Sequence, residues 1–159
     1  MMDIDEREDR AMALFREGYN CCQSVALAFS DVIASCNGMS AEQIAAVAGG
    51  FGGGFGRLRE VCGCVSGMTF VAGALHPSSP AGDARKECYA LVQEFAEAFR
   101  AENGAIVCRD LLGLRSGAKE APQPAERTPA YYKARPCERL VGSAARIVAE
   151  KLREFQNLP

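Results

Sequence analysis

Eight cysteines are the residues of this sequence best suited to chemistry. They stand at positions 21, 22, 36, 62, 64, 88, 108 and 137 of a 159-residue chain. Thiolates bind zinc and iron–sulfur clusters, and a thiolate with a lowered pKa attacks disulfides. In a reducing compartment we expect such residues to be free thiols, metal ligands or a redox couple rather than structural disulfides.

Four of these cysteines fall where the sequence predicts helix starts. They are Cys21, Cys62, Cys108 and Cys137. Cys21 follows the capping Asn20, and Cys62 opens an apolar stretch. Cys108 opens the turn CRDLLG, and Cys137 follows a proline. Unpaired backbone N–H groups and the positive end of the helix dipole stabilise a thiolate or an anionic cluster there. Either a shared site or a coincidence of helix ends explains this pattern.

The spacing of the four cysteines does not identify a metal. Successive members are 29 to 46 residues apart, without the C-x₂₋₄-C pairs of structural zinc sites or the compact runs of common ferredoxins. The other four cysteines fit different roles. Cys88 lies on the apolar face of a predicted helix and is expected in the core, while Cys36, in ASCNG, is expected at a helix end or in a loop. Cys22 and Cys64 are each a spare ligand, a resolving thiol or a small core residue.

The elements that position the cysteines are predicted to be helices, because apolar residues recur at helical spacing and no useful segment alternates like a strand. Helices are expected over about residues 5–16, 21–33, 41–48, 82–103 and 137–155, with another starting near residue 62. Asn20 with Gln23 and Ser40 with Gln43 form capping signatures, and Gly104 is expected to end the helix over residues 82–103. The helix near residue 62 is apolar nearly all the way round, so we place it at the centre. The fold class predicted is all-α: residues 1–159 form a single domain, a mostly antiparallel helical bundle.

Two segments are not predicted to be helical. GGFGGGFG, residues 49–56, fits neither G-x-G-x-x-G nor G-K-[ST], so nucleotide binding is not expected. It is either a glycine-rich loop passing close to a buried cluster or a tight helix crossing in which Phe51 and Phe55 fill the core. Residues 113–136 form a long polar C-terminal connection, expected to wrap the bundle or to stay mobile.

Charged residues near the four cysteines are a further feature. Arg57, Arg59, Arg109 and Arg135 each lie within five residues of one of them. They are solvated surface residues, or they offset the charge of a site, or they bind an acidic electron-transfer partner. The single histidine, His76, is expected in a surface loop rather than as a ligand.

Overall charge excludes some classes of partner. With 18 Lys and Arg against 20 Asp and Glu, the net charge is −2 and no stretch is densely basic, so nucleic acid is not an expected partner. The acidic beginning MMDIDEREDR differs from a secretory signal, and no apolar run approaches the roughly 20 residues of a membrane span. We therefore expect a cytoplasmic protein without membrane insertion.

Four blocks of the sequence together resemble a known family. GYNCCQSV, GGFGGGFGRLREVCGCVSGM, ENGAIVCRDLLG and RPCERLVGSAARIV are similar, in that order, to the blocks of the C_GCAxxG_C_C family of redox-active proteins. The family signature Cys-Gly-Ala-x-x-Gly corresponds to residues 62–67, where Cys64 replaces the alanine. The family's other shared cysteines correspond to Cys21, Cys108 and Cys137. The family is similar to the iron–sulfur portion of split-Soret cytochromes, which implies a [2Fe–2S] cluster; the chain lacks C-x-x-C-H, so haem is not expected.

The resemblance and the residues together predict a redox protein. We expect it to bind an iron–sulfur cluster, [2Fe–2S] by type, through Cys21, Cys62, Cys108 and Cys137, and to act as an electron carrier or redox sensor. Its partner would be an electron-transfer protein. One alternative is a metal-free thiol–disulfide oxidoreductase in which Cys62 attacks and Cys21, Cys22 or Cys64 resolves. The other is a zinc-stabilised interaction module.

Overall fold

The computed structural model describes residues 2–76, 80, 82–115, 117 and 119–157. Within these ranges the chain is helical and has no strand, apart from an isolated antiparallel bridge between Val61 and Val107. The prediction of an all-α fold is therefore confirmed. No helix in the described ranges is both long and apolar enough to cross a membrane.

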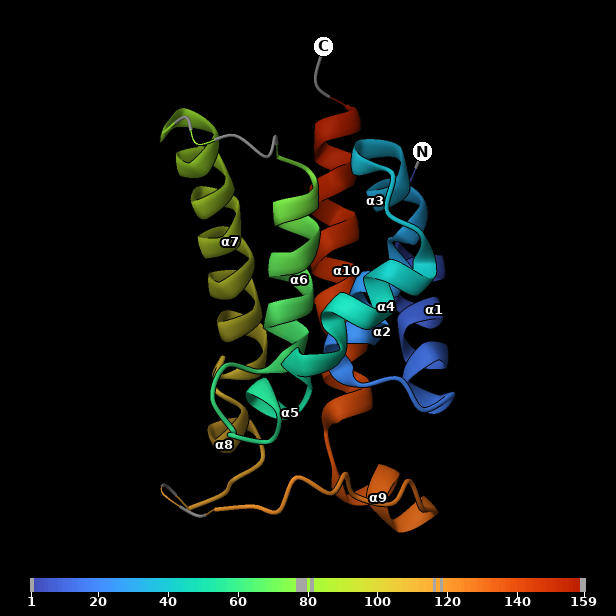
Figure 1. Cartoon of the computed structure of the whole chain (residues 1–159), viewed down its shortest axis with the longest axis vertical. Helices are drawn as coiled ribbons and strands as arrows, with labels where there is room; N and C mark the ends of the chain where they lie inside the picture. The colour runs from blue at the N-terminus through green and yellow to red at the C-terminus, as the bar shows by residue number, and fades with distance from the viewer. Residues whose placement is uncertain (1, 77–79, 81, 116, 118, 158–159) are drawn as a thin grey trace.

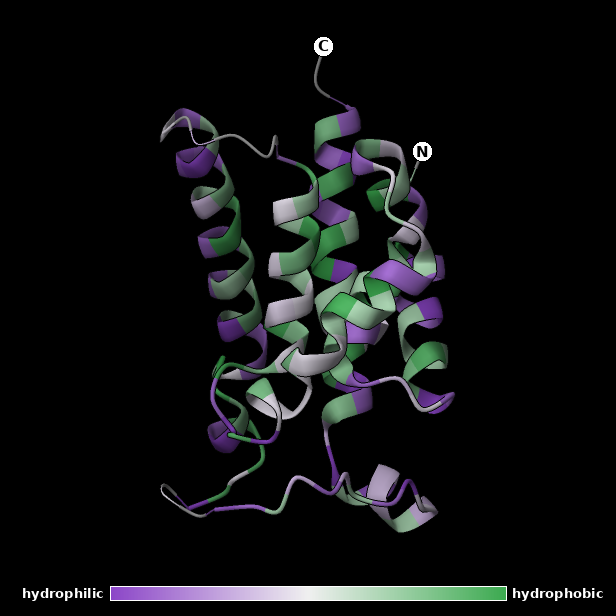
Figure 2. Ribbon diagram, in the orientation of Figure 1, coloured by the Kyte–Doolittle hydropathy of each residue, from purple (hydrophilic) through white to green (hydrophobic). Residues whose placement is uncertain are grey.

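A bundle of long helices forms the body of the molecule (Figure 1). They are α1 (Ile4–Arg16), α6 (Gly63–Ala74), α7 (Gly82–Asn103) and α10 (Cys137–Gln156), joined by the shorter α2 (Cys21–Ala28). Helix α6 packs against α2, α7 and α10. Its apolar surface is thus covered by neighbours, as the sequence predicts, whereas α1 and α7 turn polar faces outward (Figure 2).

Helix direction brings several helix starts to one end of the bundle. Helices α2, α6 and α10 all run from the lower end of Figure 1 upward, while α1 and α7 run downward. The short α8 (Cys108–Leu111) lies at the same lower end. Each of these four starting segments carries one of the four predicted cysteines.

Local sequence signals account for many of the boundaries. Asn20 and Gln23 form a reciprocal capping box at the start of α2, and Ser40 and Gln43 form another at α4 (Ala41–Ala48). Gly104 follows α7 with a φ of +90°, which favours glycine at that position. These helix starts and stops were predicted from the sequence alone.

The prediction of a single helix over residues 21–33 is wrong. Phe29 leaves helical geometry at φ −115° and ψ 23°, and the chain continues as α3 (Ser30–Asn37). The carbonyl of Ala28 accepts a hydrogen bond from Arg7 Nη1 at 2.6 Å. A side chain from α1 therefore replaces a bond that a continuous helix would have made, and the ring of Phe29 is wholly buried at the break.

The glycine-rich segment forms a 3-10 turn (Gly49–Phe51) and a short α5 (Gly52–Phe55) instead of an open loop. Gly53 and Gly54 both have φ of +67°, a left-handed conformation that side chains disfavour. Phe51 and Phe55 are 39% and 38% exposed and stack edge to face on one another. The expectation that they fill the core is wrong.

The polar connection crosses the lower end of the bundle, as one of its two predicted alternatives required (Figure 1). It contains a helix that was not predicted, α9 (Pro129–Ala134), started by a Thr128 cap. The segment has few apolar residues, which disfavours a helix, but Tyr131 and Tyr132 pack against the core. Residues 116 and 118 of this connection lie outside the described residues.

Candidate functional site

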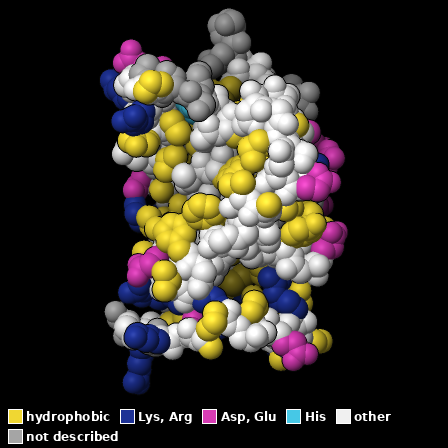
Figure 3. All heavy atoms as spheres, in the orientation of Figure 1, with side chains coloured by type: hydrophobic (Ala, Val, Ile, Leu, Met, Phe, Trp, Pro, Cys, Tyr) yellow, Lys and Arg dark blue, Asp and Glu magenta, His cyan; other side chains and the backbone are white. Residues whose placement is uncertain are grey.

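One cavity of about 360 Å³ at the lower end of the bundle is lined by five cysteines. They are the four predicted ones, Cys21, Cys62, Cys108 and Cys137, together with Cys64. Figure 3 shows a hollow between the bundle and the crossing segment, with Lys or Arg side chains beside it. The structure therefore brings together four positions that are far apart in the sequence.

The remaining three cysteines do not line this cavity. Cys22 is completely buried on α2, and Cys36 is exposed on α3. Cys88, which was expected in the core, is only half-buried on α7. Of the two undecided cysteines, Cys64 is thus the one that faces the site, and Cys22 is a core residue. His76, by contrast, follows α6 and bonds through Nδ1 to the carbonyl of Ala72.

Backbone hydrogen bonds hold two of the cysteines side by side. The N–H of Cys62 donates to the carbonyl of Ile106 at 2.8 Å, and the N–H of Cys108 donates to the carbonyl of Glu60 at 2.6 Å. The Val61–Val107 bridge lies between these bonds. These backbone contacts hold the starts of α6 and α8 together without the help of a ligand.

Two glycines allow the chain to approach the thiols closely. A Cβ built on Gly63 would lie less than 3.0 Å from the sulfur of Cys21, and one built on Gly54 would lie 2.8 Å from Cβ of Cys108. Neither distance is compatible with a side chain. The sequence prediction that glycines let the backbone pass close to the cysteines agrees with this geometry.

Cys21 has the unusual electrostatic environment. A hydrogen bond from the Cys64 thiol, reinforced by backbone N–H groups including that of Gly53, lowers the pKa of Cys21 to about 6 despite its burial. Burial raises the pKa of Cys137 to about 12 and also raises the pKa values of Cys64 and Cys108. The cavity thus favours a thiolate at Cys21 and neutral thiols at Cys64, Cys108 and Cys137 when nothing else is bound.

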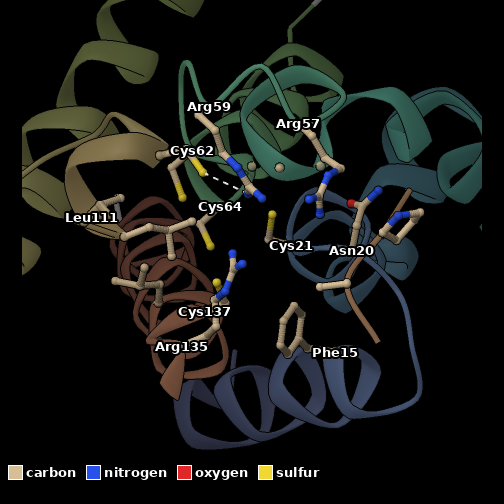
Figure 4. Close-up of a pocket in the computed structure, with 18 of the residues that line it drawn as sticks. Phe15, Asn20, Cys21, Arg57, Arg59, Cys62, Cys64, Leu111, Arg135 and Cys137 are labelled. Carbon is tan, nitrogen blue, oxygen red and sulfur yellow. Dashed lines mark hydrogen bonds between the residues drawn. The ribbon is translucent and has the colours of Figure 1, made fainter. Parts of the chain in front are cut away.

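Arg59 is the most deeply buried cation at the site, with 7% of its surface exposed. It forms an ion pair with Glu120, and its Nη1 lies 3.7 Å from the sulfur of Cys108 (Figure 4). Its Nη2 is buried and has no hydrogen-bond partner in the described part of the chain. A buried donor of this kind is costly unless a ligand accepts from it.

The other charged residues that line the cavity are also positively charged. Arg57, Arg127 and Arg135 also line the cavity, and none of its described lining residues is Asp or Glu. Arg109 instead forms an ion pair with Glu60 and lines a neighbouring surface groove. Glu120 and Arg127 were not singled out in the sequence, because they reach the site only through the fold of the polar connection.

Cys64 is hydrogen-bonded to both Cys21 and Cys62. In the described residues, no group of three or more His, Cys, Asp or Glu side chains is arranged to hold one metal ion. The role of Cys21, Cys62, Cys108 and Cys137 as ligands therefore stays a prediction, although all four line the same space.

Comparison with known proteins identifies the family. The family described as "Putative redox-active protein (C_GCAxxG_C_C)" matches residues 19–151, which include all five cysteines of the cavity. No curated protein and no solved structure matches the chain. From the extent of the match, this chain belongs to the C_GCAxxG_C_C family of redox-active proteins.

Proposed function

We propose that this protein is an electron carrier or redox sensor that binds an iron–sulfur cluster, of the [2Fe–2S] type, in the thiol-lined cavity. Cys21, Cys62, Cys108 and Cys137 would be its ligands. The observation that carries the proposal is one cavity lined by five thiols and four arginines, with Arg59 Nη1 3.7 Å from the sulfur of Cys108. A cluster held by thiolates is anionic, so its charge suits these donors.

The size of the cavity supports a cluster over zinc. A single zinc ion binds four sulfurs at about 2.3 Å each, so its ligands must converge on one point. No three described side chains do so, and the cavity of about 360 Å³ is far larger than one ion needs. A cluster of two irons and two sulfides spreads its ligands more widely.

The residues of the chain itself would hold and tune the centre. A bound cluster supplies one-electron oxidation and reduction. The backbone N–H of Gly53 and the guanidinium of Arg59 lie where they can donate to sulfur, and such bonds stabilise the more negative state. Arg57 ties the crossing segment to the site by donating to the carbonyl of Ala121 at 2.9 Å.

Metal analysis of anaerobically purified and reconstituted protein tests the proposal. We expect brown protein with iron and acid-labile sulfide in equal amounts, and loss of the visible spectrum in Cys62→Ala. Cys36→Ala is the matched control, because Cys36 is exposed and away from the cavity. Cys64→Ala, which restores the alanine of the family signature, should keep the spectrum. Iron-free, colourless protein after reconstitution would contradict the proposal, and tight stoichiometric zinc would favour the zinc module.

Thiol–disulfide exchange is a second candidate, favoured by the lowered pKa of Cys21 and its hydrogen bond from Cys64. The sequence offers Cys62 as an attacking thiol, but the lowered pKa of Cys21 favours Cys21 in that role. Its thiolate would displace one sulfur of a disulfide substrate, which leaves as a thiol after taking a proton. Cys64 would then attack the mixed disulfide, forming a Cys21–Cys64 bond and releasing the second thiol, so that two electrons pass to the substrate.

Oxidised glutathione added to the cluster-free protein separates this candidate from the first. Exchange predicts a Cys21–Cys64 disulfide by mass spectrometry, and glutathione trapped on Cys21 in Cys64→Ala. If Cys21→Ser reduces the glutathione disulfide as fast as the unchanged protein, the exchange candidate is wrong.

A further inference from the structure

The cavity is larger than an iron–sulfur core requires. A [2Fe–2S] core adds two irons and two sulfides to the protein's sulfurs. At the roughly 30 Å³ that a water molecule occupies in the liquid, four such atoms take about 120 Å³. The cavity measures about 360 Å³. Most of its volume therefore remains for another occupant.

Arginines line the cavity together with the thiols. The cavity has four of them and no carboxylate among its described lining residues, although the chain as a whole carries a net charge of −2. In Figure 4, Arg57 and Asn20 lie on the side of the Cys21 sulfur away from Cys62, and the guanidinium of Arg135 lies beside Cys21, Cys64 and Cys137. Glu120 forms ion pairs with two of these four arginines, so the cavity keeps a positive charge beside the thiols.

Several of these guanidinium groups have hydrogen-bonding capacity to spare. Arg59 Nη2 is buried without a partner. In the described residues, the side chain of Arg135 has no ion pair or hydrogen bond, and its guanidinium carbon lies 5.5 Å from the centre of the Tyr131 ring. Arg127 differs, because it donates to the carbonyls of Phe15 and Tyr19 and so serves the fold. Free donors that line a cavity favour an acceptor that comes from outside the chain.

We propose that this part of the cavity binds a small molecule through an oxyanion group such as a carboxylate. Arg59 Nη2 and the guanidinium of Arg135 would donate to the oxygens, since planar guanidinium groups match oxyanions in geometry and charge. The rings of Phe15 and Tyr131, which also line the cavity, form an apolar wall for the rest of the ligand. The ligand would lie beside the Cys21 thiol. The site needs the arginines and the cavity alone, and it coexists with a bound cluster.

Titration calorimetry with malonate tests this proposal on the full chain, in both cluster-loaded and cluster-free forms. Ionic strength is held constant with chloride, so that screening does not change. We expect saturable binding of one malonate to both forms, and affinity lowered about tenfold or more in Arg135→Gln, because a charge-assisted hydrogen bond is lost. Arg153→Gln is the matched control: Arg153 lies in the last turn of α10, at the end of that helix away from Arg135, and is exposed.

Each outcome decides the proposal. No saturable binding to either form, or equal affinity in Arg135→Gln and the unchanged protein, overturns it. Binding to the cluster-free form alone also overturns it, because the arginines would then only balance the charge of a cluster. If no cluster can be loaded at all, the proposed function fails, while malonate binding to the cluster-free protein that is weakened by Arg135→Gln still supports the anion site. Circular dichroism of each variant shows whether the fold is intact.

Discussion

Gly63 shows at the scale of one residue how closely the chain packs around the Cys21 thiol. An added methyl would lie less than 3.0 Å from that sulfur, and 3.2 Å from the carbonyl oxygen of Phe51. We expect Gly63→Ala to displace Cys21, to lower the free energy of unfolding by about 1–3 kcal/mol and to prevent cluster uptake. Urea unfolding and the visible spectrum measure both effects.

Gly73 provides the control within the same helix. Nothing lies within 4 Å of a Cβ built on it, so Gly73→Ala should stabilise α6 by about 0.5–1 kcal/mol and leave the cluster spectrum unchanged. Normal cluster uptake in Gly63→Ala would show that the close approach of α6 to Cys21 is not needed.

The thiolate of Cys21 gives a pH-dependent prediction. With its pKa lowered to about 6 by the Cys64 hydrogen bond, Cys21 of the cluster-free protein should be alkylated with a half-maximal rate near pH 6. Cys137, whose burial raises its pKa to about 12, should react only at far higher pH. Mass spectrometry of each cysteine after iodoacetamide treatment measures both.

The lowered pKa of Cys21 also determines how the free energy of unfolding depends on pH. Because the pKa of Cys21 is lower in the folded chain than its ordinary value of 9.0, the thiolate stabilises the fold fully above pH 9. This contribution is lost as the pH falls through about 6. The difference in unfolding free energy between the cluster-free protein and its Cys21→Ser variant should therefore shrink between pH 9 and pH 6, and a constant difference would contradict the lowered pKa.

At the scale of elements, the capping boxes of α2 and α4 differ in their contact with the cavity. The side chain of Asn20 caps α2 and also donates from Nδ2 to the carbonyl of Gly49 at 2.9 Å, so it ties α2 to the glycine turn. Ser40 caps α4 in the same way but does not line the cavity. Asn20→Ala and Ser40→Ala should each cost about 1 kcal/mol of stability.

Only the Asn20 variant should also affect the cavity. We expect iron release to a chelator to be faster in Asn20→Ala than in the unchanged protein, and to be unaltered in Ser40→Ala. Equal release rates in the two variants would mean that the link between α2 and the glycine turn does not hold the site together.

At the scale of the whole molecule, the predicted ligands join α2, α6, α8 and α10 at one end of the bundle. A ligand that binds only the folded chain stabilises it, so cluster loading should raise the thermal unfolding midpoint. Anaerobic circular dichroism of loaded and cluster-free protein measures this shift. Hydrogen exchange should slow most at the starts of these helices and least along the upper part of α7; equal midpoints would contradict the prediction.

Much of the fold is determined by local sequence. The capping boxes at Asn20 and Ser40, the stop at Gly104 and the apolar stretch after Cys62 act within a few residues, so the sequence alone predicts the elements they bound. The break at Phe29 escaped prediction because Arg7, from another helix, takes the hydrogen bond of Ala28. Likewise α9 depends on tyrosines whose packing surface is formed by distant helices.

The candidate site divides in the same way. Helix capping and the family signature mark Cys21, Cys62, Cys108 and Cys137 in the sequence. That they line one cavity follows only from α2, α6 and α10 running in the same direction, which no local pattern encodes. The tertiary structure alone also decided that Cys64 faces the cavity while Cys22 is in the core, and that Glu120 reaches Arg59. Contacts between segments distant in the chain depend on packing, and packing is a property of the whole fold.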